Sequence, residues 1–199
     1  MFIRIFLVLL LPVALHAQTP ALAEGDIIFQ SNISPQCKAI ELATHSRYSH
    51  CGIVFKKNDG WYVLEAVQPV RETPFAEWIA RNRGRYAVKR LRGADSLLTP
   101  AVVNEMKSAG AKYLGKDYDS YFEWSDQRIY CSELVWKVYK KATGLEVGRL
   151  QPMREYDLSH PLVKATMQER YGNNIPLEEK MVSPGNIFDS KLLETVVSR

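Results

Sequence analysis

Residues 50–66 read HCGIVFKKNDGWYVLEA, two strand-like runs on either side of a polar loop that ends in glycine. Such a loop is a strong signal for a β-hairpin. If Lys56 pairs with Trp61 across the loop, Gly52 faces Glu65, and His50 lies diagonal to Glu65 on the same side of the sheet. That register predicts a hydrogen bond between the His50 imidazole and the Glu65 carboxylate, whereas a shift by one residue would place them on opposite faces.

Cys51, the next residue along this strand, points to the other face together with Ile53 and Phe55, and we expect it in the core. The pattern also allows a simpler interpretation of the pair, in which His50 caps a strand and Glu65 stands on an exposed edge. The spacing of the two residues does not choose between these interpretations.

Strand and helix signals continue on both sides of the hairpin, and Thr73 is expected to cap one of the helices. The further strands are predicted at 27–30 and 86–91, and the helices at 35–44, 74–81, 100–113 and 131–142. Beyond Gly144 the prolines at 152, 161, 176 and 184 interrupt the pattern. This order predicts an α+β fold, with helices around a small, mostly antiparallel sheet.

The N-terminus resembles a secretory signal. Residues 5–15 are apolar apart from Pro12 and follow Arg4, and the stretch is too short to span a bilayer of roughly 30 Å. Small residues allow cleavage after Ala17 or Ala23, and we prefer Ala17 because it lies closer to the apolar stretch. A buried N-terminal strand or helix is the alternative.

Cleavage after Ala17 leaves residues 18–199 as a single domain, which we expect to be periplasmic or secreted. No cysteine lies near the cleavage region to carry a lipid, and no other segment is apolar enough to cross a membrane. The net charge of +4 comes without a basic run, so a nucleic-acid partner is not predicted.

Export implies an oxidising compartment, yet the chain has three cysteines, so at least one thiol stays free. Cys37 and Cys51 could pair. Cys131 begins a predicted helix, where free backbone N–H groups and the helix dipole lower a thiol pKa from about 8.5 and can hold an oxyanion. A buried cysteine that packs the helix start is the alternative, but His50 offers the base that a nucleophilic thiol requires.

Other chemistries lack their motifs. The sequence has no Gly-x-Ser-x-Gly elbow, P-loop, Gly-x-Gly-x-x-Gly, His-Glu-x-x-His or Cys-x-x-Cys. We therefore expect neither an organic cofactor nor a metal, since His45, His50 and Cys51 lack a recognised ligand spacing. His45 and His160 are interpreted as surface or loop residues.

An aromatic-rich loop precedes Cys131, and it contains Tyr118, Tyr121, Phe122 and Trp124. The Tyr118 hydroxyl could donate to an oxyanion, or the ring could simply pack the loop. A dry, apolar pocket around the other three rings would favour acyl chains as substrate, and an open polar groove would favour peptides.

Five separated motifs resemble a known family. They are Gly-Asp-Ile-Ile-Phe-Gln at 25–30, Ser-His-Cys-Gly-Ile-Val at 49–54, Glu65, Leu-Gly-Lys-Asp-Tyr-Asp at 114–119 and Tyr-Cys-Ser-Glu-Leu-Val at 130–135. Together they are similar to the YiiX/YaeF-type permuted papain-like amidases, relatives of the NlpC-type cell-wall hydrolases. The resemblance implies a circularly permuted papain-like fold, in which the histidine precedes the cysteine.

By that resemblance Cys131 is the nucleophile, His50 the base, Glu65 the residue that orients it, and Tyr118 an oxyanion or substrate contact. The expected partner is a peptide or an acyl-bearing substrate of the cell envelope, because relatives act on peptide amides and others on acyl groups of lipids. Acyl transfer or deacylation by the same Cys-His pair, and a non-catalytic binding module, stay open as alternatives, as does the oligomeric state.

Overall fold

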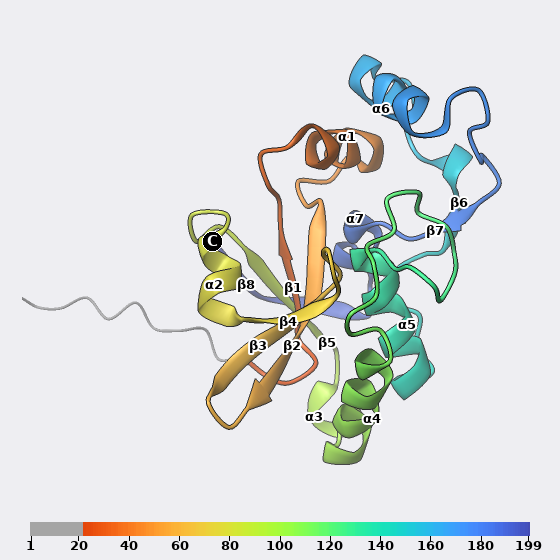
Figure 1. Cartoon of the computed structure of the whole chain (residues 1–199). Helices are drawn as coiled ribbons and strands as arrows, with labels where there is room; N and C mark the ends of the chain where they lie inside the picture. The colour runs from red at the N-terminus through yellow and green to blue at the C-terminus, as the bar shows by residue number, and fades with distance from the viewer. Residues whose placement is uncertain (1–21) are drawn as a thin grey trace, which may run out of the picture.

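The computed structural model describes residues 22–199, and a six-stranded antiparallel sheet runs through the centre of this part of the chain (Figure 1). The strands follow the order β4-β3-β2-β1-β5-β8. They are β1 (Ile27–Gln30), β2 (His50–Lys57), β3 (Gly60–Glu65), β4 (Arg71–Pro74), β5 (Ala87–Leu91) and β8 (Leu193–Ser198). The predicted signal peptide, including the cleavage point after Ala17, lies outside the described residues.

Helices surround the sheet, as the predicted α+β fold requires. They are α1 (Pro35–Thr44), α2 (Phe75–Ala80), α3 (Ala94–Leu97), α4 (Pro100–Ala111), α5 (Cys131–Thr143), α6 (Pro161–Tyr171), α7 (Pro184–Phe188) and the 3₁₀ turn η1 (Met153–Glu155). Helices α4 and α5 pack side by side on one face of the sheet, while α2 lies on the other side (Figure 1). Helices α1 and α6 pack together beyond one end of the strands, near the small sheet of β6 (Gln151–Pro152) and β7 (Lys180–Met181).

The alternation of side chains along β2 determines what each face of the sheet packs against. Cys51, Ile53 and Phe55 belong to the main core, which contains the buried side of α5, whereas Val54 packs with Trp78 of α2 in a second cluster. A side chain at Gly52 would collide with β3, because a Cβ there would lie 2.7 Å from the carbonyl oxygen of Leu64. Glycine therefore permits the close pairing of β2 and β3.

The hairpin register is confirmed, since Lys56 pairs with Trp61 and Ile53 with Leu64. The cap predicted at Thr73 is wrong: this residue belongs to β4, it is buried, and α2 begins two residues later. Its hydroxyl is used elsewhere, as a donor to the Glu65 carboxylate at 2.6 Å.

The interpretation of the late prolines as interruptions was incomplete. Pro161 and Pro184 each occupy the first turn of a helix, where a missing N–H costs nothing. His160 caps α6, its Nδ1 accepting a hydrogen bond from the backbone N–H of Leu162 at 3.1 Å. Among residues 22–199 no helix combines the length and the apolar character needed to cross a bilayer.

Candidate active site

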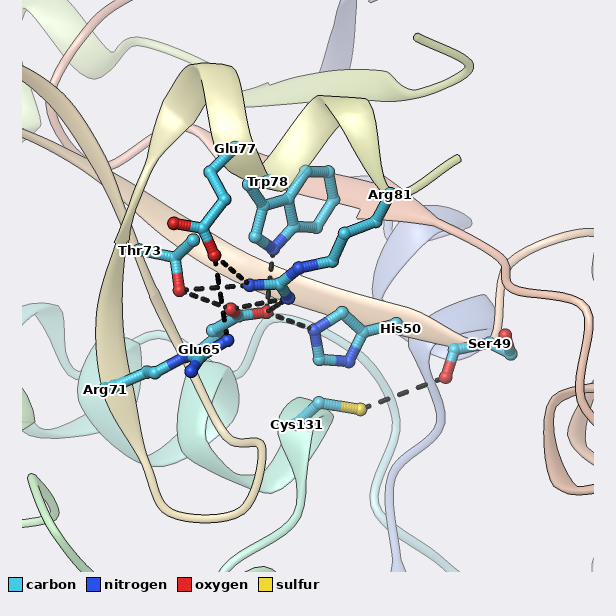
Figure 2. Close-up of polar contacts among 9 residues, drawn as sticks. All are labelled: Ser49, His50, Glu65, Arg71, Thr73, Glu77, Trp78, Arg81 and Cys131. Atoms are coloured by element: carbon cyan, nitrogen blue, oxygen red, sulfur yellow. Dashed lines mark hydrogen bonds and ion pairs between the residues drawn. The ribbon is translucent and has the colours of Figure 1, made fainter. Parts of the chain in front are cut away.

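Cys131 is the first residue of α5, and its thiol is almost fully buried beside the first residues of β2. The sulfur lies 4.0 Å from the carbonyl oxygen of Ser49 (Figure 2). A hydrogen bond with the Cys51 thiol and the interaction with the His50 imidazole lower the pKa of Cys131 well below its usual value, although burial opposes this. The thiolate is thus favoured by its neighbours and by its place at a helix N-terminus.

His50 lies between Cys131 and Glu65. Its Nε2 is 2.7 Å from the Glu65 Oε2, and the ring stacks on Trp78 with centroids 6.0 Å apart. The other ring nitrogen lies on the side of the Cys131 sulfur (Figure 2). Burial disfavours the imidazolium, but hydrogen bonds to Cys131 and Glu65 outweigh it and raise the pKa of His50 from 6.5 to about 10. The geometry and charges suit a thiolate–imidazolium pair.

Glu65 is completely buried at the end of β3, and it accepts hydrogen bonds from four side chains. Besides His50 they are Thr73 at 2.6 Å, the Trp78 indole at 2.8 Å and the Arg81 guanidinium at 2.7 Å (Figure 2). Burial alone would raise the pKa of Glu65, but the bond to His50 and these other donors lower it to about 2. The carboxylate is therefore ionised and held in one orientation.

Thr73, Trp78 and Arg81 were not predicted as site residues. Trp78 and Arg81 stand three residues apart at the end of a short helix, a spacing that puts side chains on one face. The spacing could have shown that the two side chains lie on the same face. Only the packing of α2 over the hairpin shows that this face contacts Glu65. Arg81 also counters the charge of Glu65, which would be costly to bury alone.

Cys51 has a second role that the strand pattern did not predict. It is fully buried on the opposite face of β2 from His50, as expected, but α5 packs on that same face and brings Cys131 against it. Burial and the neighbouring Cys131 raise the pKa of Cys51 well above its usual value. Cys51 thus stays a protonated donor to the Cys131 sulfur. Cys37, Cys51 and Cys131 are all free thiols, so the suggested pairing of Cys37 with Cys51 is absent.

Tyr118 lies next to the thiol, where it lines a pocket shared with Cys131. Its backbone N–H donates to the Gln68 side chain at 2.7 Å, and the residue forms a bridge with Ile129. Burial raises the pKa of Tyr118 well above its usual value, and the neighbouring Cys131 adds to this, so the phenol keeps its proton.

The other aromatic residues of this loop are separated. Phe122 lines the same pocket, but Tyr121 packs on Tyr171 and Trp124 packs on Trp136, away from the thiol. The three rings therefore do not surround one pocket, and only Phe122 lines the space beside the thiol. The chain turns at Phe122, which has a positive φ of 54°. The side chains of Tyr121 and Trp124, on either side of it, therefore pack against different parts of the protein.

Two spaces of different character meet at the Cys131–His50 pair. The apolar pocket is lined by side chains of α1, α6, η1 and β7, and it reaches Cys131; they include Ala39, Ala43, Met153, Val163, Met167 and Met181. The second space, which we call the polar cleft, is more open and has the larger share of polar lining. Its lining contains His50, Gln68, Arg81 and Ser120 together with the apolar Ile40, Ala66 and Val67. Ser49 and Tyr118 belong to both linings, so the two spaces adjoin.

Three comparisons relate the chain to known proteins. Residues 21–197 match the model of a family described as permuted papain-like amidase enzyme, YaeF/YiiX, C92 family. The chain is 49% identical over 192 residues to uncharacterized protein YiiX of Escherichia coli K12, covering 94% of each sequence. It also matches a crystal structure of YiiX from Escherichia coli O157:H7 with a TM-score of 0.84 and 51% identity, over 88% of this chain and 97% of that one.

That crystal structure is described as a metalloprotein. In this chain His45 pairs with Asp157 at 3.1 Å rather than with His50. Across residues 22–199 no group of three or more His, Cys, Asp or Glu side chains is placed to hold a metal ion.

The order of the site residues along the chain agrees with the family match. The histidine lies on a strand that precedes the cysteine-bearing helix, which is the reverse of the order in ordinary papain-like enzymes. With the family model covering almost the whole described chain and close to half of all residues shared with YiiX, the protein is an enzyme that belongs to the YaeF/YiiX family of permuted papain-like cysteine amidases.

Proposed function

We propose that this protein is an exported cysteine hydrolase that cleaves an amide or ester bond through a thioester intermediate, with Cys131 as nucleophile, His50 as base and Glu65 as the residue that orients the base. The observation that carries the proposal is the chain of contacts from Glu65 through His50 to a thiol at the start of α5. The expected substrate is a peptide or acyl-bearing molecule of the cell envelope.

Each step moves one proton through His50. The imidazole takes the proton of Cys131, and the thiolate attacks the carbonyl carbon, so that a C–S bond forms and the carbonyl electrons move to oxygen. When the C–N or C–O bond breaks, His50 gives its proton to the leaving amine or alkoxide. Water then loses a proton to His50 and attacks the thioester, which releases a carboxylic acid and restores the thiol.

Backbone N–H groups at the start of α5 are available to hold the oxyanion, because the first turn of a helix leaves its N–H groups without intrahelical partners. Tyr118 is the proposed side-chain contact, since its phenol stays protonated and it lines the pocket beside the sulfur. Together these donors face the carbonyl oxygen as charge develops on it.

Acyl transfer is the second candidate, and it shares the thioester. It differs only in what attacks the thioester: a hydroxyl or amine of a second molecule replaces water. The polar cleft beside His50 is open enough to admit either acceptor. A pure binding module is disfavoured, because binding alone would not need a buried carboxylate, an imidazole and a thiol arranged in sequence from Glu65 through His50 to Cys131.

The thioester itself can be trapped. Reaction with p-nitrophenyl acetate, followed by an acid quench and intact mass spectrometry, should show one added acetyl group on Cys131, and hydroxylamine should remove it. Release of p-nitrophenol should begin with a burst equal to the enzyme concentration. Acetylation confined to lysines, or a thiol that stays unmodified, would contradict the proposal.

Export rests on the apolar stretch at residues 5–15 and on the small residues that follow it. Cleavage after Ala17 is preferred because Leu22 packs against the second core cluster and the N–H of Ala23 donates to Asp26 at 2.8 Å, so cleavage after Ala23 would remove contacts of the folded domain. N-terminal sequencing of protein from the cell envelope should begin at Gln18. Full-length protein confined to the cytoplasm would contradict export.

A further inference from the structure

The apolar pocket ends at the nucleophile of the proposed reaction, and this places one part of the substrate. We propose that the pocket binds the hydrocarbon chain of an acyl group, so that the substrate is a long-chain N-acyl or O-acyl compound whose polar head group occupies the polar cleft. This inference rests on the proposed function and adds the substrate class to it. The volume of the pocket is about 80 Å³.

Most of the polar side chains around the pocket are already paired with the protein. The exceptions in character are Tyr118, whose hydroxyl is kept for the oxyanion, and the charged Arg170, which bonds to Gln36 of the same lining at 3.4 Å. Ser132 donates to the carbonyl of Val182 at 2.8 Å, Tyr156 donates to Asn186 at 2.6 Å, and Thr166 donates to the carbonyl of Leu162 at 2.9 Å. Thr44 likewise bonds to the carbonyl of Ile40 at 2.8 Å. A peptide backbone in this pocket would therefore leave its own N–H and C=O groups without partners, which is costly, whereas a hydrocarbon chain needs none.

The lining can also adapt to its occupant. Met153, Met167 and Met181 line the pocket, and they are three of the five methionines in the sequence. Methionine is unbranched and polarisable, and it fits chains of varied shape. These side chains belong to a cluster between α1 and α6 that is separate from the main core. The pocket therefore lies between this cluster and the main core.

The positions of the two reacting groups orient the substrate. The acyl carbon stays on Cys131 in the thioester, so the acyl chain must lie in the space that reaches Cys131, which is the apolar pocket. The leaving group receives its proton from His50, which lines the polar cleft. Hydrolysis would therefore release a long-chain carboxylate from the pocket and a polar amine or alcohol from the cleft.

A series of p-nitrophenyl esters, from acetate through butyrate and octanoate to decanoate, tests the pocket. Because each buried methylene contributes binding energy, kcat/KM should rise about fourfold per methylene until the pocket is full. The acetyl ester needs no pocket. If the wild-type enzyme hydrolyses none of the esters, including the acetate, the proposed function is overturned. If it hydrolyses the acetate but kcat/KM is equal for all chain lengths, only the acyl-chain inference is overturned.

Two substitutions fill the pocket from different walls. Ala43→Trp on α1 and Thr166→Phe on α6 should each lower kcat/KM for octanoate and decanoate relative to kcat/KM for acetate, so that the preference for long chains is lost. The matched controls are Ala101→Trp and Ala165→Phe, which place the same side chains at exposed positions of α4 and α6. Melting temperatures close to that of wild type show that each variant is folded, and two filling variants keep the test valid if one is not.

The same assay includes a peptide arm. p-Nitrophenyl esters of N-acetyl-leucine and N-acetyl-phenylalanine present an apolar side chain together with backbone amide groups. We expect kcat/KM for these esters to stay well below that for octanoate. A clear preference for the amino-acid esters, lost in Ala43→Trp, would identify the pocket as a side-chain site of a peptidase and would overturn the inference.

Discussion

Replacing Cys131 with alanine should lower kcat/KM for p-nitrophenyl esters by at least about 10⁴-fold, because the group that forms the covalent intermediate is lost. The fold should persist. The substitution removes one sulfur atom at the edge of the main core and leaves the backbone of α5 and its N-terminal hydrogen bonds unchanged. Steady-state kinetics measures the first effect, and thermal denaturation the second.

Cys51→Ala is the matched control, because it removes the other buried thiol at the same place. We expect a loss of stability of roughly 1 kcal/mol, since the sulfur is fully enclosed, and retention of most of the activity. Some loss of rate is expected, because Cys51 donates to the Cys131 sulfur and helps to lower its pKa. If Cys51→Ala were as inactive as Cys131→Ala, or Cys131→Ala stayed active, the assignment of the nucleophile would be wrong.

Replacing His50 with alanine should raise the apparent pKa of Cys131 towards the free-thiol value of about 8.5, because the thiolate loses its imidazolium partner. At pH 6 a free thiol is roughly 0.3% thiolate, so alkylation by iodoacetamide should slow by up to roughly 300-fold at that pH. Above pH 9 the rates of wild type and variant should converge. The measurement is the rate of alkylation of Cys131 as a function of pH.

Glu65→Gln should shift the same curve in the same direction but less, since it weakens the support of the imidazolium and leaves the ring in place. His45→Ala and His160→Ala are the controls. His45 pairs with Asp157, and His160 caps α6, so neither contacts the thiol and neither should move the curve. A shift caused by His160 instead of His50 would mean that the base follows the cysteine in the chain and that the permuted order is wrong.

Arg81, Trp78 and Thr73 extend the site beyond the four predicted residues. A carboxylate that accepts four hydrogen bonds cannot rotate, and its lowered pKa keeps it ionised while the imidazole changes charge. In the proposed reaction Glu65 would therefore act through the orientation and charge of His50. Helix α2 and the Arg81 that caps its end supply two of the donors, so in the proposed reaction they would position the base as well as pack against the sheet.

The local features of this protein could be read from the sequence because each depends on neighbouring residues. The register of β2 and β3 follows from the loop that joins them and from the alternation of apolar residues. The hydrogen bond between His50 and Glu65 could therefore be predicted from the sequence. The start of α5 at Cys131 likewise follows from helical spacing. Together with the order of five motifs, these features identified the family.

The features that required the tertiary structure join segments that are distant in the chain. The periodicity of the sequence does not predict that α5 places Cys131 next to Cys51. Nor does it predict that Trp78 and Arg81 contact Glu65. The apolar pocket depends on α1 meeting α6, where Gln36 and Arg170, 134 residues apart, are hydrogen-bonded at 3.4 Å. Such contacts arise from the way whole elements pack, because an apolar face shows only that a helix is buried and leaves its partner unspecified.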